Sequence, residues 1–387
     1  MAGTRRRRKE NTGPVPVRYY DYSLVAVLVF LVCFGLVMLY STSAYTALIE
    51  NEDSMYYFKR QILFCGAGVV IIYVVSRINY HWYIGKAKAI YFFSLFLMFL
   101  VKTPLGKEVN GARRWIRLPM GQQFQPSELA KIAVILFIPV LICKMGKEFR
   151  SLQGVVKILA WGGVCAAAVL FLTDNLSTAA IVFGITYIVV AVAHPRTKVF
   201  LALAGIGVAG LVTFVLAFGS GFASSSDFRL RRLAAWLHPE QYADGQAYQT
   251  LQGLYAIGSG GFFGKGLGNS AQKMVIPEVQ NDMILTVICE ELGVFGVIVV
   301  LVLFGMLLYR ILFIAQNAPD MYGTLVVMGI FAHITLQVFL NIAVVTNILP
   351  NTGVTLPFIS YGGTSVLFLM AEMGIVLGVS RTIKLSE

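Results

Sequence analysis

A single carboxylate lies where a polar stretch of the sequence meets a long apolar one. Asp282 follows a glycine-rich segment that runs from Gly258 to about Pro277, and the apolar run after it extends from Met283 to about Leu308. Glycine and proline disfavour regular structure in the first segment, whereas the second is long enough to cross a membrane. Because a carboxylate at such a boundary is partly withdrawn from water, its pKa rises toward that of a working general base. Asp282 is therefore the first candidate catalytic residue.

Ten of the 31 lysines and arginines fall in two polar segments, 102–127 and 220–282. Arginine presents a planar fork of donors that matches phosphate oxygens, and lysine presents a compact positive charge. We interpret these cations as the binding site of an anionic ligand; lipid headgroups or a simple solvated surface are the alternatives. The basic candidates in these segments are Arg113, Arg114, Lys265 and Lys273.

Glu128 and Lys131 mark the start of another apolar run. They are three residues apart, so a helix places both on one face, where they can form an ion pair. One interpretation is a structural ion pair at the beginning of a membrane helix. The other is that Lys131 faces an internal cavity and presents its ammonium group to phosphate, because charges inside membrane helices seldom lack a function.

Two features on either side of Asp282 leave alternatives open. The glycines between 258 and 268 could cradle a phosphate with backbone amides or form a mobile hinge. Since they lack a Gly-x-x-x-x-Gly-Lys-Ser/Thr pattern, they predict neither ATP nor a dinucleotide.

Glu290 and Glu291 lie roughly 12 Å beyond Asp282 at the helical rise of about 1.5 Å per residue. They indicate either a conduction path or, as we prefer, a buried hydrogen-bonded helix contact.

The composition sets the class of protein. The chain has 387 residues, of which 57% are hydrophobic and 13% charged, and its mean hydropathy is +0.75. Long apolar runs separated by short polar breaks exclude an ordinary soluble domain and predict an all-α polytopic membrane protein. The five cysteines fall within apolar runs without metal-binding spacing or a disulfide framework, so we expect buried thiols.

We expect about ten transmembrane helices in one membrane domain, residues 22–380. A basic cytoplasmic tail, 1–21, precedes this domain, and a short cytoplasmic tail, 381–387, follows it. One large extracytoplasmic loop, 220–282, separates spans seven and eight. The spans are expected at roughly 22–42, 60–76, 87–102, 127–144, 154–172, 176–193, 199–219, 283–309, 321–345 and 359–380.

The basic residues also orient the chain. An even number of spans places both termini on one side of the membrane, and more of the 31 lysines and arginines fall on that side than on the other. Since cytoplasmic loops are enriched in these residues, the sequence predicts cytoplasmic termini. Asp282 and the loop 220–282 are then extracytoplasmic.

Three loop segments have patterns of their own. Residues 227–237 place apolar side chains on one helix face and arginines on the other, which predicts a helix in the membrane interface. Residues 246–257 are also compatible with a helix. Residues 350–364 are rich in turn formers yet apolar, so we expect this segment to dip into the bundle, where protein buries its backbone.

Five motifs resemble those of the SEDS family (shape, elongation, division and sporulation), the polytopic peptidoglycan polymerases. They occur in the family's order, and the span pattern covers nearly the whole chain. The form Gly-Leu-Gly-Asn-Ser-x-Gln-Lys is more similar to the division and sporulation branch, FtsW and SpoVE, than to RodA. The motifs are NGARRWI (110–116), QPSELAK (125–131), GSGGFFGKGLGNSAQK (258–273), IPEVQNDMI (276–284) with EELG (290–293), and LPNTGVTLPFISYGGTS (349–365).

The resemblance implies polymerisation of lipid II into β-1,4 glycan strands on the outer face of the bacterial cytoplasmic membrane. Asp282 matches the family's catalytic acid, and Glu128 and Lys131 match the family's Gln-Pro-Ser/Ala-Glu motif. Asn175 stands where the family often has Asp, so no chemistry is assigned to its turn. The residues that replace the usual His, Thr and Phe around the acid are Gln280, Asn281 and Met283.

Such a reaction needs one base and positive charge at the leaving group. The 4-hydroxyl of an acceptor GlcNAc attacks the anomeric carbon of a MurNAc whose polyprenyl diphosphate departs, with inversion. Diphosphate leaves readily, so a general acid is not needed, in contrast to glycoside hydrolysis. Asp282 would be the base. A divalent cation, Mg²⁺ or Mn²⁺, could assist, although no dedicated ligand cluster stands out. The residues expected to bind the diphosphate or the sugars are Arg113, Arg114, Glu128, Lys131, Lys265 and Lys273.

The family also implies partners. Besides lipid II and the growing glycan strand, we expect a single-pass class B penicillin-binding protein, whose helix packs on exposed apolar faces of spans eight and nine. Other membrane proteins of division or sporulation are expected, and nucleic acid is not.

Two other classes of function are alternatives. The chain could be a lipid II flippase that uses intramembrane polar residues as a headgroup path, or a scaffold without chemistry. The large basic loop favours the enzyme, because a flippase needs comparable binding features on the inner side. The intramembrane polar residues are Lys131, Glu290, Glu291, His333, Gln337, Asn341 and Glu372.

Overall fold

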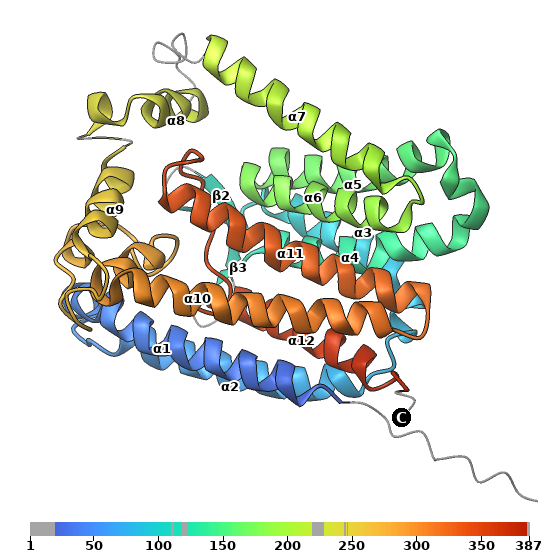
Figure 1. The fold of residues 1–387 in the computed structure, drawn as a ribbon, viewed down its shortest axis with the longest axis horizontal. Coiled ribbons are helices and arrows are strands. Elements are labelled where there is room, and N and C mark those ends of the chain that lie inside the picture. Colours follow the sequence, from blue (N-terminus) through green and yellow to red (C-terminus); the bar gives the residue numbers. More distant parts are fainter. Residues whose placement is uncertain are drawn as a thin grey trace, which may run out of the picture.

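The computed structural model describes residues 20–109, 112–117, 123–218, 228–243, 245 and 247–384, and most of them are helical. Ten helices lie where the ten spans were predicted (Figure 1). Within the described ranges, eight of them are long and apolar enough to cross a membrane, and α7 and α12 contain shorter apolar stretches. The ten are α1 (Tyr22–Asn51), α2 (Tyr56–Arg77), α3 (Trp82–Leu100), α4 (Pro126–Met145), α5 (Leu152–Leu172), α6 (Leu176–Ala193), α7 (Thr197–Phe218), α10 (Ile284–Asn317), α11 (Met321–Val345) and α12 (Thr364–Ser380).

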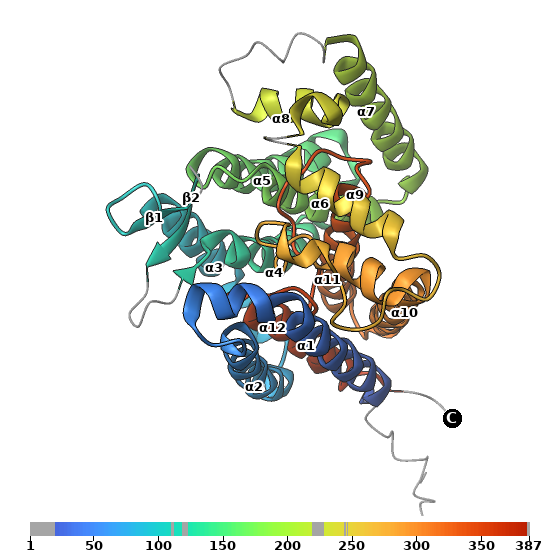
Figure 2. The same cartoon turned by 90° about the vertical axis from the view of Figure 1, so that its left-hand side faces the viewer.

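The helices form one bundle with two distinct ends. Helix α4 lies inside it and packs against α3, α5, α6 and α11, and most of its residues are buried. Its apolar faces suit contact with other helices on every side, and the buried Glu128 and Lys131 pair with each other inside the bundle. Helix α7 leans away from the bundle and packs against α6 (Figures 1 and 2).

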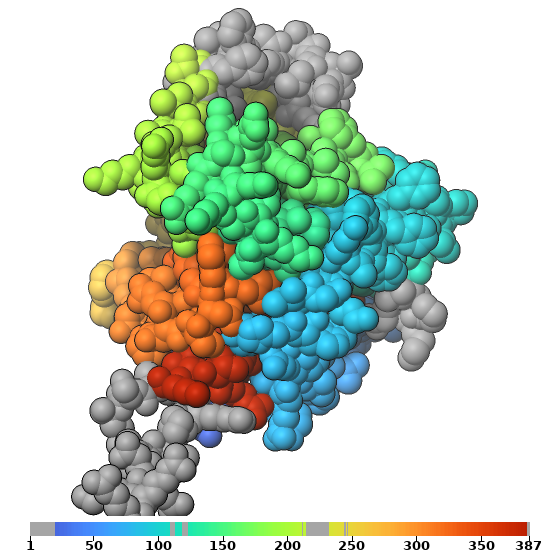
Figure 3. Space-filling model, turned by 90° about the vertical axis from the view of Figure 1, so that its right-hand side faces the viewer, coloured from blue at the N-terminus to red at the C-terminus, as the bar shows by residue number. Residues whose placement is uncertain are grey.

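The segment 228–282 lies at one end of the bundle, which we call the loop end; Figure 2 views the molecule from it. Figure 3 views the opposite end, where the connection between α10 and α11 (orange) and the end of α12 (red) reach the surface. Helix α1 begins at that opposite end, where α12 also ends, as expected for an even number of spans (Figure 1). Most of the predicted N-terminal tail, residues 1–19, lies outside the described residues.

A small antiparallel sheet occupies the first polar segment, which the sequence analysis did not foresee. Its strand order is β1-β2-β3, with β2 in the middle. Along β2 the side chains alternate, so that Arg113 and Arg117 are exposed while Arg114 is partly buried and Ile116 is buried. The strands are β1 (Gly106–Val109), β2 (Ala112–Arg117) and β3 (Gln123–Phe124).

The long loop contains two α-helices close to the predicted positions. The indole Nε1 of Trp236 donates to the carbonyl of Asn347 at 2.9 Å and thereby ties α8 to the end of α11. Single turns of 3₁₀-helix follow α8 and precede α10. These elements are α8 (Phe228–Leu237), η4 (Pro239–Tyr242), α9 (Tyr248–Ser259) and η5 (Gln272–Met274).

Helix α10 is broken at Gly293, where φ is 67° and ψ is −160°. The break leaves carbonyl groups without partners inside the helix, and the glycine-rich loop supplies those partners. The backbone amides of Lys265 and Gly266 donate to the carbonyls of Glu290 and Glu291, each at 2.9 Å. On the other side of the break, two helix amides donate to loop carbonyls. The loop therefore completes the hydrogen bonding of a broken membrane helix.

This packing explains the glycines of the loop. A Cβ on Gly264 would lie 2.2 Å from the carbonyl oxygen of Glu291, and one on Gly260 would lie 2.0 Å from that of Cys289. Only glycine lets the two backbones approach so closely. Because four backbone hydrogen bonds join the loop to α10, the loop is a structural element of the bundle, which argues against the mobile hinge considered above.

The segment 350–364 is irregular and largely buried, as its composition predicted. It packs so tightly that a Cβ on Gly35 of α1 would lie 2.6 Å from the carbonyl oxygen of Phe358. Side-chain amides of α11 satisfy its backbone: Asn341 donates to the carbonyl of Val354 at 2.7 Å and Gln337 to that of Thr355 at 3.0 Å. Irregular backbone is stable at this depth because the neighbouring helices supply its hydrogen bonds.

Candidate active site

A cavity of about 580 Å³ opens at the loop end of the bundle. The corner between α1 and α2, strands β2 and β3, helices α4, α6 and α11, and the segments before α10 and α12 all contribute to its wall. Four of the predicted site residues line it, namely Asp282, Arg114, Glu128 and Lys131. Polar side chains from distant parts of the sequence thus meet in one cavity.

Asp282 is held in place through both its backbone and its side chain. Asn341 of α11 donates to the backbone carbonyl of Asp282 at 2.8 Å, and Gln249 of α9 donates to its Oδ1 at 3.2 Å. Gln249 is fixed in turn, because it accepts from Asn351 at 2.8 Å and donates to the carbonyl of Pro277 at 3.0 Å. Asp282 is therefore held by α11, by α9 and, through Gln249, by the segment 350–364.

The surroundings of Asp282 raise the pKa of its carboxyl group to about 6. Burial is the main cause, and the negative charge of Glu278 acts in the same direction. The hydrogen bond from Gln249 and the positive charge of Arg232 oppose the rise. A carboxylate with this pKa is ionised at neutral pH and basic enough to accept a proton from a reacting hydroxyl.

Arg232 contributes positive charge near Asp282, although the sequence predicted only that it lies in an interfacial helix. It donates to the carbonyl of Asn351 at 3.5 Å, and its charge acts on Asp282. Burial lowers the pKa of Arg232, whereas Asp282 raises it. The run of arginines in α8 was visible in the sequence, but the fold alone places one of them near the carboxylate.

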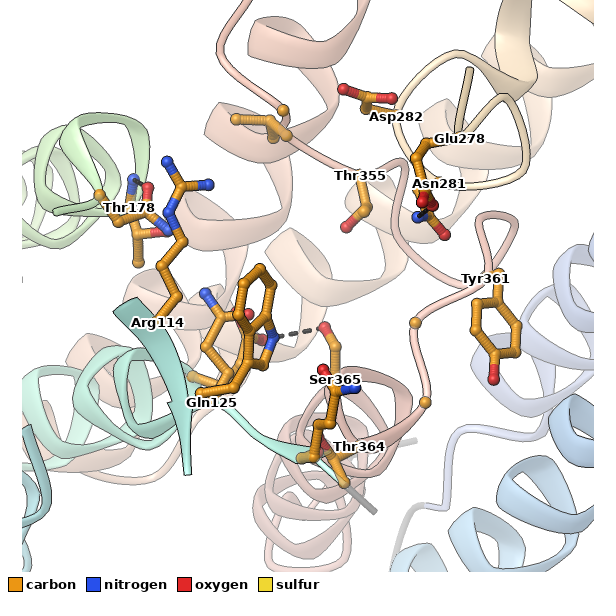
Figure 4. A pocket seen from close by; sticks show the side chains of 18 of the residues that line it. Arg114, Gln125, Thr178, Glu278, Asn281, Asp282, Thr355, Tyr361, Thr364 and Ser365 are labelled. Atoms are coloured by element: carbon orange, nitrogen blue, oxygen red, sulfur yellow. Dashed lines mark hydrogen bonds between the residues drawn. The ribbon is translucent and has the colours of Figure 1, made fainter. Parts of the chain in front are cut away.

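Arg114 and Lys131 provide positive charge at the cavity. Figure 4 shows Arg114 across the pocket from Asp282. Lys131 forms an ion pair with Glu128, 3.0 Å between Nζ and Oε1, and donates to Gln337 at 3.3 Å. The structural ion pair of the first interpretation is present, and both residues also line the cavity. Presentation of the ammonium group to phosphate stays a prediction.

Arg113 lies outside the cavity. Its Nε is 3.1 Å from Oε2 of Glu108 on the neighbouring strand, and its side chain is exposed. The alternation of a β-strand explains this placement, because Arg113 and Arg114 must point to opposite faces of the sheet. We therefore withdraw Arg113 from the candidate site.

Lys265 and Lys273 also lie apart from the cavity wall. Lys265 is 2.7 Å from Oε1 of Glu290, and Lys273 is 3.1 Å from Oε1 of Glu291. Both carboxylates are fully buried, and such charges require a countercharge and hydrogen bonds. The two lysines supply that countercharge outside the cavity lining, so the structure does not place them at the candidate site.

The same contacts decide between the two interpretations of the acidic pair. Glu290 also accepts hydrogen bonds from Ser259 and Ser270, and Glu291 accepts one from Ser41 of α1. The preferred prediction, a buried hydrogen-bonded contact, is confirmed, and the partners include the long loop as well as another helix. Neither acid is among the residues that line the cavity.

A second set of cavity residues was not foreseen. Tyr57 donates to Oε2 of Glu50 at 2.8 Å, and Asn281 donates to Oε2 of Glu278 at 2.6 Å. Burial, together with the charge of Glu50, raises the pKa of Glu278. Glu278 stands in a quoted motif and could have been chosen from the sequence, whereas nothing in the sequence linked Glu50 to it.

The residues that depart from the family motif have structural roles. The backbone carbonyl of Gln280 accepts from the amide of Tyr361 at 3.0 Å, and Met283 is fully buried. Asn175 caps α6, because its side chain accepts from the amide of Thr178 at 3.0 Å. These contacts hold the loops of the cavity together.

The described residues contain no group of three or more His, Cys, Asp or Glu side chains arranged to hold a metal ion. The carboxylates of the cavity wall instead accept hydrogen bonds from neighbouring side chains. The donor set does not fit a dedicated divalent site, so we derive no step through a metal.

The fold and the cavity define a polytopic helical membrane protein with a carboxylate and basic groups facing each other across a polar cavity at one end of the bundle. A family model described as a cell cycle protein, FtsW/RodA/SpoVE, matches residues 22–385. The chain belongs to this family.

Relatives and solved structures match almost the whole chain. Stage V sporulation protein E of Bacillus subtilis (strain 168) is 38% identical over 366 residues, which cover 93% of this chain and 97% of that protein. A probable peptidoglycan glycosyltransferase FtsW of Trichlorobacter lovleyi is 37% identical over 381 residues, 96% of each chain. A chain from a peptidoglycan synthase complex that coordinates polymerization and crosslinking has a TM-score of 0.75 at 27% identity and covers 94% of this chain and 98% of its own. Thermus thermophilus RodA has a TM-score of 0.66 at 26% identity and covers 95% and 98%.

Proposed function

We propose that this chain is a peptidoglycan glycosyltransferase that polymerises lipid II into β-1,4 glycan strands. Full-length similarity to proteins named as probable peptidoglycan glycosyltransferases supports the reaction class. The observation that carries the proposal is the cavity itself, in which Asp282, with a pKa raised to about 6, lies across from Arg114 and shares the wall with Lys131.

In this proposal the two sides of the cavity have different tasks. Asp282 accepts the proton of the acceptor sugar's 4-hydroxyl as its oxygen attacks the anomeric carbon of the donor. The bond between that carbon and the diphosphate oxygen breaks, and its electron pair leaves with the polyprenyl diphosphate. Arg114 and Lys131 stabilise the negative charge that develops there. Attack from the side opposite the leaving group inverts the anomeric centre.

The proposed orientation places the loop end outside the cytoplasm and both termini inside. The cavity then opens at the leaflet in which a polymerase of the outer surface must meet its lipid-linked substrate. We further propose a class B penicillin-binding protein as partner, supported by the similarity to a chain of a complex that couples polymerization to crosslinking.

Synthesis of glycan from labelled lipid II by the purified chain with its partner tests the proposal. Asp282→Ala should lower the rate by roughly 10²- to 10⁴-fold, the usual contribution of a general base. The control is Asp53→Asn at the loop end, which removes an exposed carboxylate paired with Lys59 at 2.8 Å and should leave the rate unchanged.

The outcomes separate the proposed enzyme from its rivals. Glycan synthesis by Asp282→Ala at the parental rate would exclude the catalytic role. Transbilayer movement of lipid II in liposomes, unaffected by the same substitution, would favour a flippase. The buried pairing of Glu290 and Glu291 with Lys265 and Lys273 argues against a flippase, because it removes those acids from any headgroup path.

A further inference from the structure

A chain of buried polar side chains leads from the cavity into the bundle. Lys131 of α4 donates to Oε1 of Gln337 at 3.3 Å, and Nε2 of His333 lies 2.8 Å from the same oxygen. Nδ1 of His333 lies 2.8 Å from Oε2 of Glu372 on α12. All four side chains are at most 3% exposed. The mechanism above uses only the first of them.

The orientation of Gln337 follows from its partners. Its Nε2 donates to the carbonyl of Thr355 at 3.0 Å, and a carbonyl can only accept. The lysine ammonium can only donate, so Oε1 must be the atom that faces Lys131. Since Oε1 cannot donate either, Nε2 of His333 must carry a hydrogen. The contacts of Gln337 with Thr355 and Lys131 therefore fix the orientation of its amide and place a hydrogen on Nε2 of His333.

The second nitrogen of His333 faces a carboxyl group. With Nε2 protonated, Nδ1 either carries a proton and donates to Glu372, or accepts a proton from it. In both cases the pair has no net charge and holds one proton between the two groups. A lone buried charge would be costly, so this shared proton lets the pair exist inside the bundle. Glu372 thereby anchors the imidazole at Nδ1 while Nε2 donates to Gln337.

We propose that Gln337, held by the His333–Glu372 pair, is a positioning residue that directs the ammonium group of Lys131 toward a diphosphate in the cavity. Among the described residues, Glu128 and Gln337 accept from this ammonium group, which leaves one of its three N–H groups for a ligand. The inference rests on the proposed function, because it names the diphosphate as that ligand.

Two substitutions at Glu372 separate geometry from charge. In Glu372→Gln the new amide donates to Nδ1, so a neutral His333 keeps its hydrogen on Nε2 and still holds Gln337. In Glu372→Leu no group holds Nδ1, so the imidazole can rotate away from its place between α11 and α12. The Nε2–H group then no longer holds Oε1 of Gln337 in position, and Lys131 loses its support.

The test measures binding of polyprenyl diphosphate to the purified full chain through thermal stabilisation, together with kcat and KM for lipid II. Gln337→Leu and Glu372→Leu should weaken diphosphate binding about tenfold, as loss of a hydrogen bond to a charged group predicts, and should raise KM more than they lower kcat. Glu372→Gln should retain most of the affinity. The matched control is Thr335→Val, because the Thr335 hydroxyl on the same helix has no hydrogen-bond partner among the described residues.

Parental diphosphate affinity in Gln337→Leu, or equal losses in Glu372→Gln and Glu372→Leu, would overturn the inference. If Gln337→Leu lacks a cooperative unfolding transition, Gln337→Asn replaces it, since Asn keeps the amide but withdraws it from Lys131. Asp282→Ala should bind the diphosphate normally. Normal glycan synthesis by Asp282→Ala, alongside weak binding in Gln337→Leu, would remove the proposed function and leave the inference intact.

Discussion

At the scale of single residues, the partner of each charged group decides its role. Lys131 and Lys265 are both paired with a glutamate, yet only Lys131 lines the cavity. The carboxylates Asp282 and Glu290 differ in the same way. Asp282 accepts one hydrogen bond from Gln249, whereas Glu290 is paired with a lysine and accepts several bonds from the long loop. A carboxylate with few hydrogen bonds and no ion pair keeps a higher pKa and is the better base.

Two neighbouring arginines offer a matched test of the cationic side. Arg114→Gln should lower kcat/KM for lipid II by roughly 10²- to 10³-fold, comparable to the loss of one donor that stabilises developing negative charge. Arg113→Gln should leave kcat/KM unchanged, because Arg113 faces away from the cavity and pairs with Glu108. Steady-state glycan synthesis measures both. Equal losses of kcat/KM in the two variants would mean that the face of β2 on which an arginine lies does not decide its role in the reaction.

At the scale of elements, the loop end is assembled from segments that are not regular membrane helices. Strand β2 carries Arg114, the loop before α10 carries Asp282, and the segment 350–364 packs against both α1 and α11. The glycine-rich loop fills the break at Gly293. The rigidity of these joints keeps the carboxylate and the cations on opposite sides of the cavity.

A pair of glycines tests the role of the break in α10. Gly264 and Gly261 both have positive φ, 77° and 60°, but only a Cβ on Gly264 would meet the backbone of α10. Gly261→Ala should cost roughly 1–2 kcal/mol, the penalty of a left-handed conformation. Gly264→Ala should cost more, because the loop must also move away from Glu291. Thermal unfolding in detergent measures the difference, and equal losses of stability would contradict the proposed packing.

The helices could be predicted from the sequence, but several site assignments could not. Long apolar runs encode membrane helices directly, and all ten were found, although the predicted ends of α1 and α10 fall nine and eight residues short. The segment with Arg113 and Arg114 is too short and polar to reveal a strand, so their opposite faces were hidden. Lys265 and Lys273 were misassigned because composition places a lysine in a loop without naming the carboxylate that it meets.

At the scale of the whole molecule, helix α10 presents an apolar stripe to its surroundings. Phe295, Val302, Met306 and Tyr309 are each at least 50% exposed, and their spacing places them on one face of the helix. Such a face suits either lipid or another membrane helix. A transmembrane partner that couples crosslinking to polymerisation could bind here without blocking the cavity at the loop end.

Charged substitutions test this face. Val302→Lys should reduce co-purification of the proposed class B partner, because a buried charge between two membrane helices is costly. The control is Val164→Lys on α5, where a valine is 52% exposed, close to the 53% of Val302. Val164→Lys should have little effect on co-purification of the proposed partner. Undiminished recovery of the partner with Val302→Lys would place the interface elsewhere.

The pH dependence of kcat/KM for lipid II polymerisation tests the central claim most directly. Burial raises the pKa of Asp282 from 3.8 to about 6, and only the ionised form accepts a proton. The rate should therefore fall about tenfold for each pH unit below about 6 and level off above it. This acid limb should be absent from the residual activity of Asp282→Asn. A profile of the parent protein that is flat from pH 5 to 8, or parental activity in Asp282→Asn, would contradict the account.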